Sequence, residues 1–202
     1  MIKLYGYGPT RWSKCIWMAS ELGITLEEEN VQYTGDGFGD ENYRKIHPFG
    51  LVPALQDGDF TLFESQAIIN YLGEKFPEKS LVPKSGTYER ALYDQWTYFC
   101  TATLEFPLTS WFRHSFIFDE KTKNQVEIDR ASEELKKQLI ILNSVLENKS
   151  FLVGNRFTAA DISMTYTLNW ATGFGFLEGN NNLKNYTETH LKRDAFPKHL
   201  YE

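Results

Sequence analysis

The chain has 202 residues, of which 42% are hydrophobic and 15% aromatic, so it can bury the core of one large domain or two smaller ones. Its 27 acidic and 21 basic side chains give a formal net charge of -6, and the scattered basic residues argue against a nucleic-acid partner. No basic leader precedes the first apolar residues, and no apolar run approaches the roughly 20 residues of a membrane span, so we expect a cytoplasmic protein without a membrane partner.

The first part of the chain alternates strand-like and helix-like patterns. Residues 2–5 form a short β-type run, and apolar residues then recur at helical spacing from Trp12 to Leu22, where Gly23 is placed to end the helix. Residues 27–32 can form a second strand. That strand would complete a βαβ unit, with parallel pairing through a right-handed crossover.

A hairpin is predicted next. A weak helical pattern over residues 41–46 precedes two short β-type runs within residues 54–62. These runs flank Asp57-Gly58, a dipeptide typical of a tight hairpin turn.

A closing helix and a linker mark the end of the first domain. Residues 65–76 have an apolar face at helical spacing, and Pro77 ends the helix. The predicted order of the domain over residues 1–78 is therefore βαβαββα. Residues 79–86 have little periodicity and suit a linker, and residues 87–202 are predicted to be an all-α domain.

The helical domain shows three further patterns. Residues 88–116 are predicted to form one long aromatic-rich helix, kinked at Pro107. Residues 128–146 form a second amphipathic helix with a charged outer face. Thr158 and Asp161 stand three residues apart before an apolar run, which predicts a capping box at the start of another helix.

The cysteines and histidines are isolated in the sequence, and their spacing matches no catalytic or metal-binding motif. The two cysteines, Cys15 and Cys100, lack the CxxC spacing of a dithiol and the clusters of a zinc site, so we expect reduced thiols and no metal. His47 and His114 are expected to be ordinary hydrogen-bonded imidazoles at the surface or in the core.

Three short motifs lie on the predicted elements, and these are Leu51-Val52-Pro53, Phe63-Glu64-Ser65 and Phe157-Thr158-Ala-Ala-Asp161. Together with the βαβαββα order, they resemble the glutathione transferase family over essentially the whole chain. The resemblance implies a thioredoxin-like N-terminal domain, an all-α helical bundle as the C-terminal domain, glutathione as co-substrate, and a homodimer. The Gly8-Pro9-Thr10-Arg11 loop is most similar to bacterial members.

The resemblance also implies how glutathione binds. A cis Val52–Pro53 bond would turn the Val52 backbone toward the ligand, which can pair with it like an added strand. Glu64 and Ser65 open a helix and can bind the ammonium and carboxylate of the γ-glutamyl group. The alternative is that Pro53 only begins a strand and Ser65 only caps a helix. Further expected contacts are Arg11, Trp12 and Leu51, although many relatives have a polar residue in place of this leucine.

The group that activates the glutathione thiol is expected in the loop after the first strand. Thr10 is our first choice because it lies where serine-type relatives place their hydroxyl, and Ser13 is the second. Tyr7 is a further hydroxyl in this loop, whereas Tyr5 alternates like a strand residue and is expected in the sheet. Cys15 lies on the apolar face of the first helix and is interpreted as a core thiol rather than a nucleophile.

The electrophile is expected between the two domains, and the candidate aromatic residues are Tyr98, Phe106, Trp111 and Phe112. An aromatic stripe at helical spacing also fits simple packing. The implied function is transfer of the glutathione thiolate to small hydrophobic electrophiles. The alternatives are a non-catalytic binding or regulatory module of the same fold, and a glutathione-dependent thiol reductase that uses Cys15.

Overall fold

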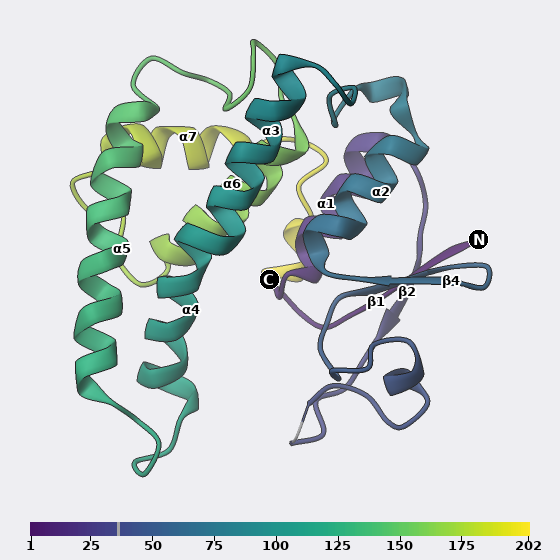
Figure 1. Cartoon of the computed structure of the whole chain (residues 1–202), viewed down its shortest axis with the longest axis horizontal. Coiled ribbons are helices and arrows are strands. Elements are labelled where there is room, and N and C mark those ends of the chain that lie inside the picture. The colour runs from purple at the N-terminus through teal and green to yellow at the C-terminus, as the bar shows by residue number, and fades with distance from the viewer. Residues whose placement is uncertain (36) are drawn as a thin grey trace. The chain divides into compact units, whose positions relative to one another are not determined.

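The computed structural model describes residues 1–35 and 37–202, which divide into two compact units. The first unit comprises Met1–Val82 together with Arg193–Glu202, and the second comprises Pro83–Lys192. Figure 1 shows the change along the chain from a mixed α/β unit to a helical one. Within the described residues, we find no helix with the length and apolar character needed to cross a membrane.

The sheet of the first unit has the strand order β2-β1-β3-β4 among the described residues (Figure 1). Strand β1 pairs in parallel with β2 and antiparallel with β3, which pairs antiparallel with β4. The elements are β1 (Ile2–Gly6), α1 (Trp12–Leu22), β2 (Glu27–Asn30), β3 (Ala54–Asp57), β4 (Phe60–Phe63) and α2 (Ser65–Lys75). The predicted βαβ unit, hairpin and closing helix are confirmed.

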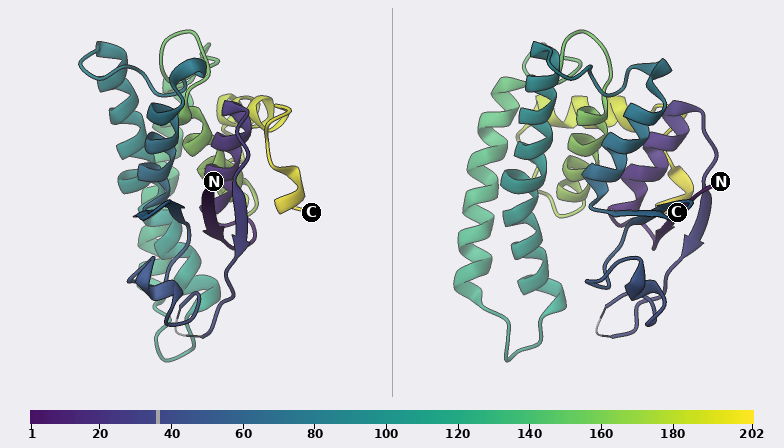
Figure 2. Two further views of the ribbon diagram at one scale, coloured as in Figure 1. Left: turned by 90° about the vertical axis from the view of Figure 1, so that its right-hand side faces the viewer. Right: turned by 45° about the vertical axis from the view of Figure 1, so that its right-hand side comes forward.

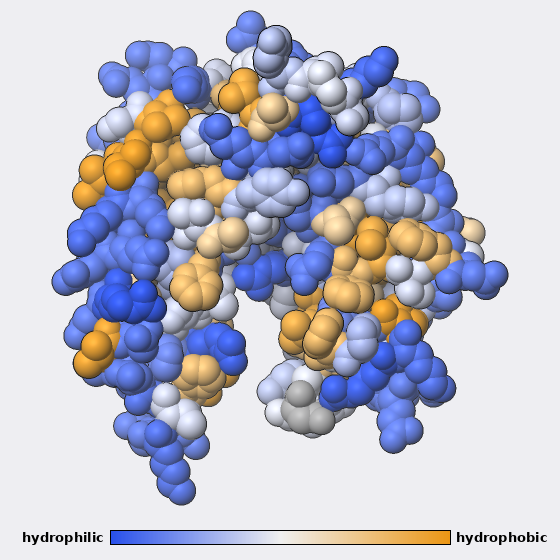
Figure 3. Space-filling model, in the orientation of Figure 1, coloured by the Kyte–Doolittle hydropathy of each residue, from blue (hydrophilic) through white to orange (hydrophobic). Residues whose placement is uncertain are grey.

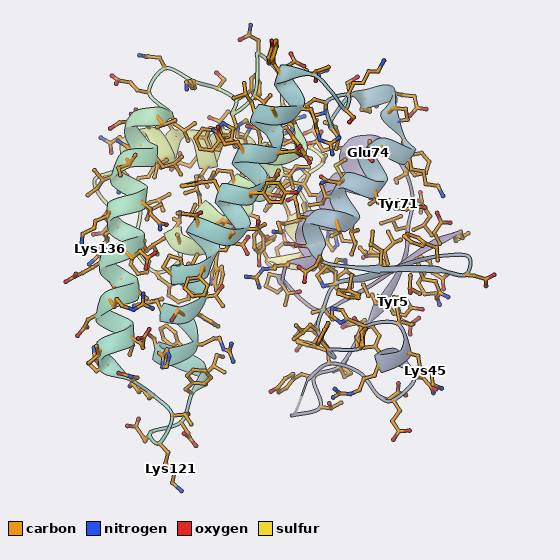
Figure 4. The ribbon with its side chains drawn as sticks, in the orientation of Figure 1. Tyr5, Lys45, Tyr71, Glu74, Lys121 and Lys136 are labelled. Carbon is orange, nitrogen blue, oxygen red and sulfur yellow. The ribbon has the colours of Figure 1, made fainter. Side chains whose placement is uncertain are left out.

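Two layers of side chains cover the two faces of this sheet. Helices α1 and α2 pack against each other on one face, where Met18, Ile68 and Leu72 are fully buried (Figure 2). The chain between β2 and β3 covers the other face, where Tyr5 and Tyr43 belong to a buried cluster. Figure 4 shows Tyr5 on this side of the sheet. The expectation that Tyr5 packs in the sheet is therefore confirmed.

The helix expected over residues 41–46 is only a 3-10 turn, η1 (Tyr43–Lys45). The Asp40 carboxylate starts the turn by accepting the backbone N–H groups of Asn42 and Tyr43, both at 3.0 Å. Pro48 follows closely and disfavours a helical conformation for the residue before it, so the turn cannot lengthen into a regular helix.

The tail segment, Arg193–Glu202, is part of the first unit, whereas the sequence placed it in the range 87–202 of the helical domain. It contains one short 3-10 turn, η5 (Lys198–Leu200), and lies against α1. Its apolar residues show no helical periodicity, so nothing local in the sequence indicated where it packs.

The second unit is helical throughout its regular structure, which confirms the predicted all-α part (Figure 1). Its helices are α3 (Tyr88–Tyr98), α4 (Glu105–Phe112), α5 (Gln125–Val145), α6 (Ala159–Thr172) and α7 (Asn181–Leu191). The predicted amphipathic helix corresponds to α5, which buries Ala131, Leu135 and Leu139.

The predicted long helix is continuous from Tyr88 to Ile117, but it is not α-helical throughout. A π-helical segment, η3 (Phe99–Leu104), separates α3 from α4, and a second one, η4 (Arg113–Ile117), follows α4. Pro107 lacks an N–H and its ring crowds the carbonyl four residues earlier, so the wider π turns just before it accommodate the missing hydrogen bond.

The start of α6 confirms the predicted capping box. Oδ2 of Asp161 accepts the backbone N–H of Thr158 at 2.8 Å and its hydroxyl at 3.0 Å. Oδ1 accepts the N–H of Leu152 at 2.8 Å and the phenol of Tyr186 at 2.6 Å. Asp161 is fully buried, so four donors replace water around its carboxylate.

Candidate functional site

One edge of the sheet collects the residues that the sequence singled out in the first unit. Tyr5, near the end of β1, lies opposite Ala54 at the start of β3, and Ala54 lies opposite Phe63 at the end of β4. The loop after β1, the Val52–Pro53 bond and the start of α2 therefore meet at this edge. We call the group Thr10, Val52, Pro53, Glu64 and Ser65 the sheet-edge site.

The Val52–Pro53 bond is cis, as predicted, and Pro53 is buried. The phenol of Tyr43 donates to the carbonyl of Leu51 at 2.6 Å and holds the loop in front of the proline. Within the described part of the chain, neither the N–H nor the C=O of Val52 has a hydrogen-bond partner. An extended peptide can therefore pair with Val52.

The start of α2 is built differently from an ordinary capped helix. Glu64 is exposed and has φ of 73° and ψ of 112°, a conformation that costs a residue with a Cβ about 1 to 3 kcal/mol. Its side chain makes no capping bond. Ser65 is buried, and its hydroxyl has no partner among the residues described. The first N–H groups of the helix and this hydroxyl are suited to an anion.

The two hydroxyls proposed for thiol activation have different surroundings. Ser13 is only 2% exposed, and its Oγ donates to the Thr10 carbonyl at 2.9 Å. It also lies 2.9 Å from the phenol oxygen of Tyr201. Thr10 is partly exposed, and its Oγ1 accepts only a long contact of 3.5 Å from the N–H of Trp12. No described residue accepts the Thr10 hydroxyl proton, so this geometry favours Thr10 over Ser13 as a donor to a ligand.

Of the other expected glutathione contacts in this loop, Arg11 is the N-cap residue of α1 and makes no side-chain cap. Trp12 is 4% exposed and lies in the core beneath Gly6. A side chain on Gly6 would come within 1.9 Å of the indole, so this close approach requires glycine. The structure thus places Arg11 at the start of α1 and buries the Trp12 ring, which was expected to contact glutathione, in the core. Leu51 is 54% exposed next to Val52.

Cys15 is a core thiol, as predicted. It is fully buried, and burial raises the pKa of its thiol to about 12. Its Sγ lies 3.7 Å from the Ser65 carbonyl, so it packs behind the start of α2. Full burial keeps the Cys15 thiol away from a disulfide substrate, and the raised pKa disfavours its thiolate, so neither observation supports a reductase that uses Cys15. Cys100 is also buried and lies 3.2 Å from the Thr167 hydroxyl.

His47 departs from the expectation of an ordinary hydrogen-bonded imidazole. It is 4% exposed, and its Nδ1 has no partner among the described residues. The centroid of its ring lies 4.8 Å from that of Phe63, the residue that precedes Glu64. Burial lowers its pKa, although the Glu64 carboxylate opposes this, so a neutral imidazole stands behind the site. His114 matches the expectation, since its Nδ1 accepts the Asn124 N–H at 3.2 Å.

An aromatic row beside Thr10 was also missed. Tyr7, in the loop that leads to Thr10, lies 5.7 Å from Phe38, which lies 5.4 Å from Tyr33. Tyr7 and Tyr33 remain 41% and 60% exposed. The two segments are far apart in the sequence, and only the parallel pairing of β1 with β2 indicates that the loops after them are neighbours. Figure 3 shows apolar side chains gathered on the first unit.

The residues expected to line an electrophile pocket all belong to the second unit. Tyr98 and Phe106 are 68% and 60% exposed. Trp111 and Phe112 belong to an aromatic cluster whose other members are Phe116, Trp170, Phe174 and Phe176. Trp111 also lines an open groove of about 620 Å³ between α5 and the segment after α6. Figure 4 shows Lys136, another residue of this groove, on α5.

Comparison with known proteins identifies the family. Residues 1–74 match the family model described as "Glutathione S-transferase, N-terminal domain", and residues 99–194 match "Glutathione S-transferase, C-terminal domain". Glutathione S-transferase F12 of Arabidopsis thaliana is 38% identical over 81% of this chain and 78% of its own length. Glutathione S-transferase D7 of Drosophila melanogaster is 32% identical over 87% and 77%. The chain belongs to the glutathione S-transferase family.

Solved structures agree with this assignment. Glutathione transferase URE2P6 of Phanerochaete chrysosporium, in complex with oxidized glutathione, has a TM-score of 0.87 and 30% identity, with 99% of this chain and 94% of that chain covered. The relatives are not all named as transferases, since a stringent starvation protein A homolog of Coxiella burnetii is 32% identical over 72% of this chain and 63% of its own length.

Proposed function

We propose that this chain is a glutathione transferase that adds the glutathione thiolate to small hydrophobic electrophiles. The observation that carries the proposal is the set of unpartnered polar groups at the sheet-edge site. The Val52 backbone, the Ser65 hydroxyl and the Thr10 hydroxyl proton all lack partners among the described residues. Buried or half-buried polar groups are normally paired, so three such groups at one sheet edge indicate a polar ligand.

Glutathione has the charges and the backbone that these groups can bind. Its γ-glutamyl carboxylate suits the Ser65 hydroxyl and the first N–H groups of α2, and its ammonium suits the exposed Glu64 carboxylate. Its cysteinyl amide suits the free N–H and C=O of Val52. These contacts would hold the thiol near the start of α1, where Arg11 adds positive charge.

The thiol must lose its proton near neutral pH. A free thiol has a pKa near 8.5, and lowering it by about 2 units requires roughly 2.7 kcal/mol. The start of α1, which has no side-chain cap, contributes about 0.3 to 2 kcal/mol, and one hydrogen bond to the charged sulfur contributes about 1.5 to 3 kcal/mol. We assign that hydrogen bond to the Thr10 hydroxyl.

For the electrophile, we propose an apolar pocket that includes the aromatic candidates of the second unit. On the first unit, the exposed rings of Tyr7 and Tyr33, which flank the partly buried Phe38, support an apolar surface next to the thiol. We further propose a cytoplasmic homodimer, which sedimentation of the purified chain would test.

The experiment that tests the function combines binding with turnover. Calorimetry with glutathione should give binding in the micromolar to millimolar range, and a chloronitroarene should be conjugated at a rate that depends on glutathione. Binding without turnover, across several electrophiles, would favour the non-catalytic module instead. The absence of binding would contradict the transferase and leave only a regulatory module that does not bind glutathione.

A further inference from the structure

The tail segment binds along one face of α1. Ser13, Trp17 and Glu21 are spaced four residues apart and therefore lie on the same side of this helix. The Arg193 guanidinium forms two hydrogen bonds with the Glu21 carboxylate, from Nε at 2.5 Å and from its second terminal nitrogen at 2.8 Å. The Glu21 side chain is only 9% exposed, so this paired geometry fixes the beginning of the tail at the end of α1.

Aromatic contacts continue from there toward the start of the helix. Phe196 meets the Trp17 ring edge-on with centroids 5.1 Å apart. The same Phe196 stacks on Tyr201 at 5.1 Å with an interplanar angle of 28°. The tail thus runs antiparallel to α1 and ends over its first turn, next to the loop that carries Thr10 (Figure 2).

The last contact forms a directed chain of hydrogen bonds. The single hydroxyl proton of Ser13 is donated to the Thr10 carbonyl at 2.9 Å, so the phenol of Tyr201 must be the donor in its 2.9 Å contact with Ser13 Oγ. Burial raises the pKa of the Tyr201 phenol, so the phenol keeps the proton that it donates.

The loop that carries Thr10 depends on these hydrogen bonds, because few other contacts hold the loop in place. The Thr10 carbonyl accepts hydrogen bonds from the N–H and from the hydroxyl of Ser13, both at 2.9 Å. The Thr10 N–H makes only a long bond of 3.4 Å to the Tyr7 carbonyl. Gly8 has φ of 47° and open space where a side chain would stand.

We propose that Tyr201 is a positioning residue for thiol activation, which acts through Ser13 to hold the Thr10 hydroxyl at the sheet-edge site. This inference rests on the proposed function. It makes the tail segment part of the glutathione site, although no tail residue need touch the ligand. Ser13 then has a supporting role rather than a direct one.

The test compares Tyr201→Phe with wild type and with Tyr88→Phe, a control that removes the phenol of a residue that is 94% exposed. The pKa of glutathione bound to each protein is measured from the ultraviolet absorbance of its thiolate, together with glutathione affinity and Tm. Tyr201→Phe keeps the stacking ring, so we expect similar affinity, a higher bound-thiol pKa, and a kcat/KM about three- to tenfold lower at neutral pH.

Ser13→Ala provides the second variant and decides the matter if Tyr201→Phe does not fold. It should raise the pKa of the bound thiol in the same direction. The double variant should be no worse than Ser13→Ala alone, because Tyr201 acts through Ser13. Additive effects, or an unchanged thiol pKa with a lower Tm, would overturn the proposal. If wild type gives no thiolate signal with glutathione, the proposed function fails, whereas a wild-type signal that Tyr201→Phe leaves unmoved overturns the positioning role alone.

Discussion

Helices α2 and α6 both begin with a hydroxyl residue and an acidic residue close together, but the two starts have opposite character. At α6, Asp161 is buried and accepts four hydrogen bonds. At α2, Glu64 is exposed with positive φ, and the Ser65 hydroxyl is unpaired within the described chain. A helix start that satisfies all its own groups contributes stability, and one that leaves them open is available for a ligand.

The largest effect is expected from Asp161→Ala at the satisfied start. It leaves buried donors from Leu152, Thr158 and Tyr186 without an acceptor, so the free energy of unfolding should fall by about 3 kcal/mol or more. Urea denaturation measures this loss. Glutathione affinity of the folded fraction should stay near that of wild type, and a variant as stable as wild type would contradict the role of the cap.

The open start should respond in the reverse way. Ser65→Ala should weaken glutathione binding by about 1 to 3 kcal/mol while changing the free energy of unfolding by less than about 0.5 kcal/mol. Glu64→Gly should stabilise the fold by about 1 kcal/mol because glycine accepts positive φ, yet it should also weaken binding. Calorimetry and denaturation on the same samples separate the two quantities. Unchanged affinity in both variants would mean that this helix start binds no γ-glutamyl group.

Thr10→Ala tests the neighbouring start of α1, which also lacks a side-chain cap. Glutathione affinity should change only a few-fold, because the main binding contacts are elsewhere. The pH midpoint of kcat/KM should rise by about one unit, equivalent to about 1.4 kcal/mol of lost thiolate stabilisation. If the pH profile moves with Tyr7→Phe and not with Thr10→Ala, the hydroxyl has been misassigned.

The smallest effect concerns Cys15, which packs behind the open start without taking part in it. Its thiol pKa is about 12 in the folded chain and near 9 when unperturbed, so the stability of the wild type falls as pH rises through this window. At pH near 10 the loss from this group is on the order of 1 kcal/mol. Cys15→Ala should flatten this part of the curve of unfolding free energy against pH. Identical slopes from pH 9 upward would show that the thiol is not buried as described.

Local signals in the sequence predicted the elements that depend on neighbouring residues. The helix end at Gly23 and the capping box at Thr158 each need only a few adjacent positions, and both are present. The predicted hairpin is present too, but its two loop residues are Gly58 and Asp59, because Asp57 ends β3 and pairs with Phe60. The cis bond at Val52–Pro53 followed from the family resemblance rather than from spacing.

Features that depend on distant residues were not predictable in this way. The position of Trp12 is decided by the missing side chain of Gly6, and the unpartnered Nδ1 of His47 depends on how the loop packs on Phe63. The π-helical segment before Pro107 is only a few residues long, so the spacing of its apolar residues does not distinguish it from an α-helix. Ser13 has a plausible hydroxyl in the sequence, and only its hydrogen bond to the Thr10 carbonyl in the structure shows that its proton is already used.

The tail segment also affects the order in which the chain can fold during synthesis. The first unit is discontinuous in the sequence. Arg193 and Tyr201 can therefore contact Glu21 and Ser13 only after the entire second unit has left the ribosome. Until then, the tail does not cover this face of α1, and the Trp17 ring lacks its contact with Phe196. The contacts on the helix that follows the Thr10 loop are therefore completed only by residues translated after the second unit, so that unit is synthesised before the tail can hold the loop.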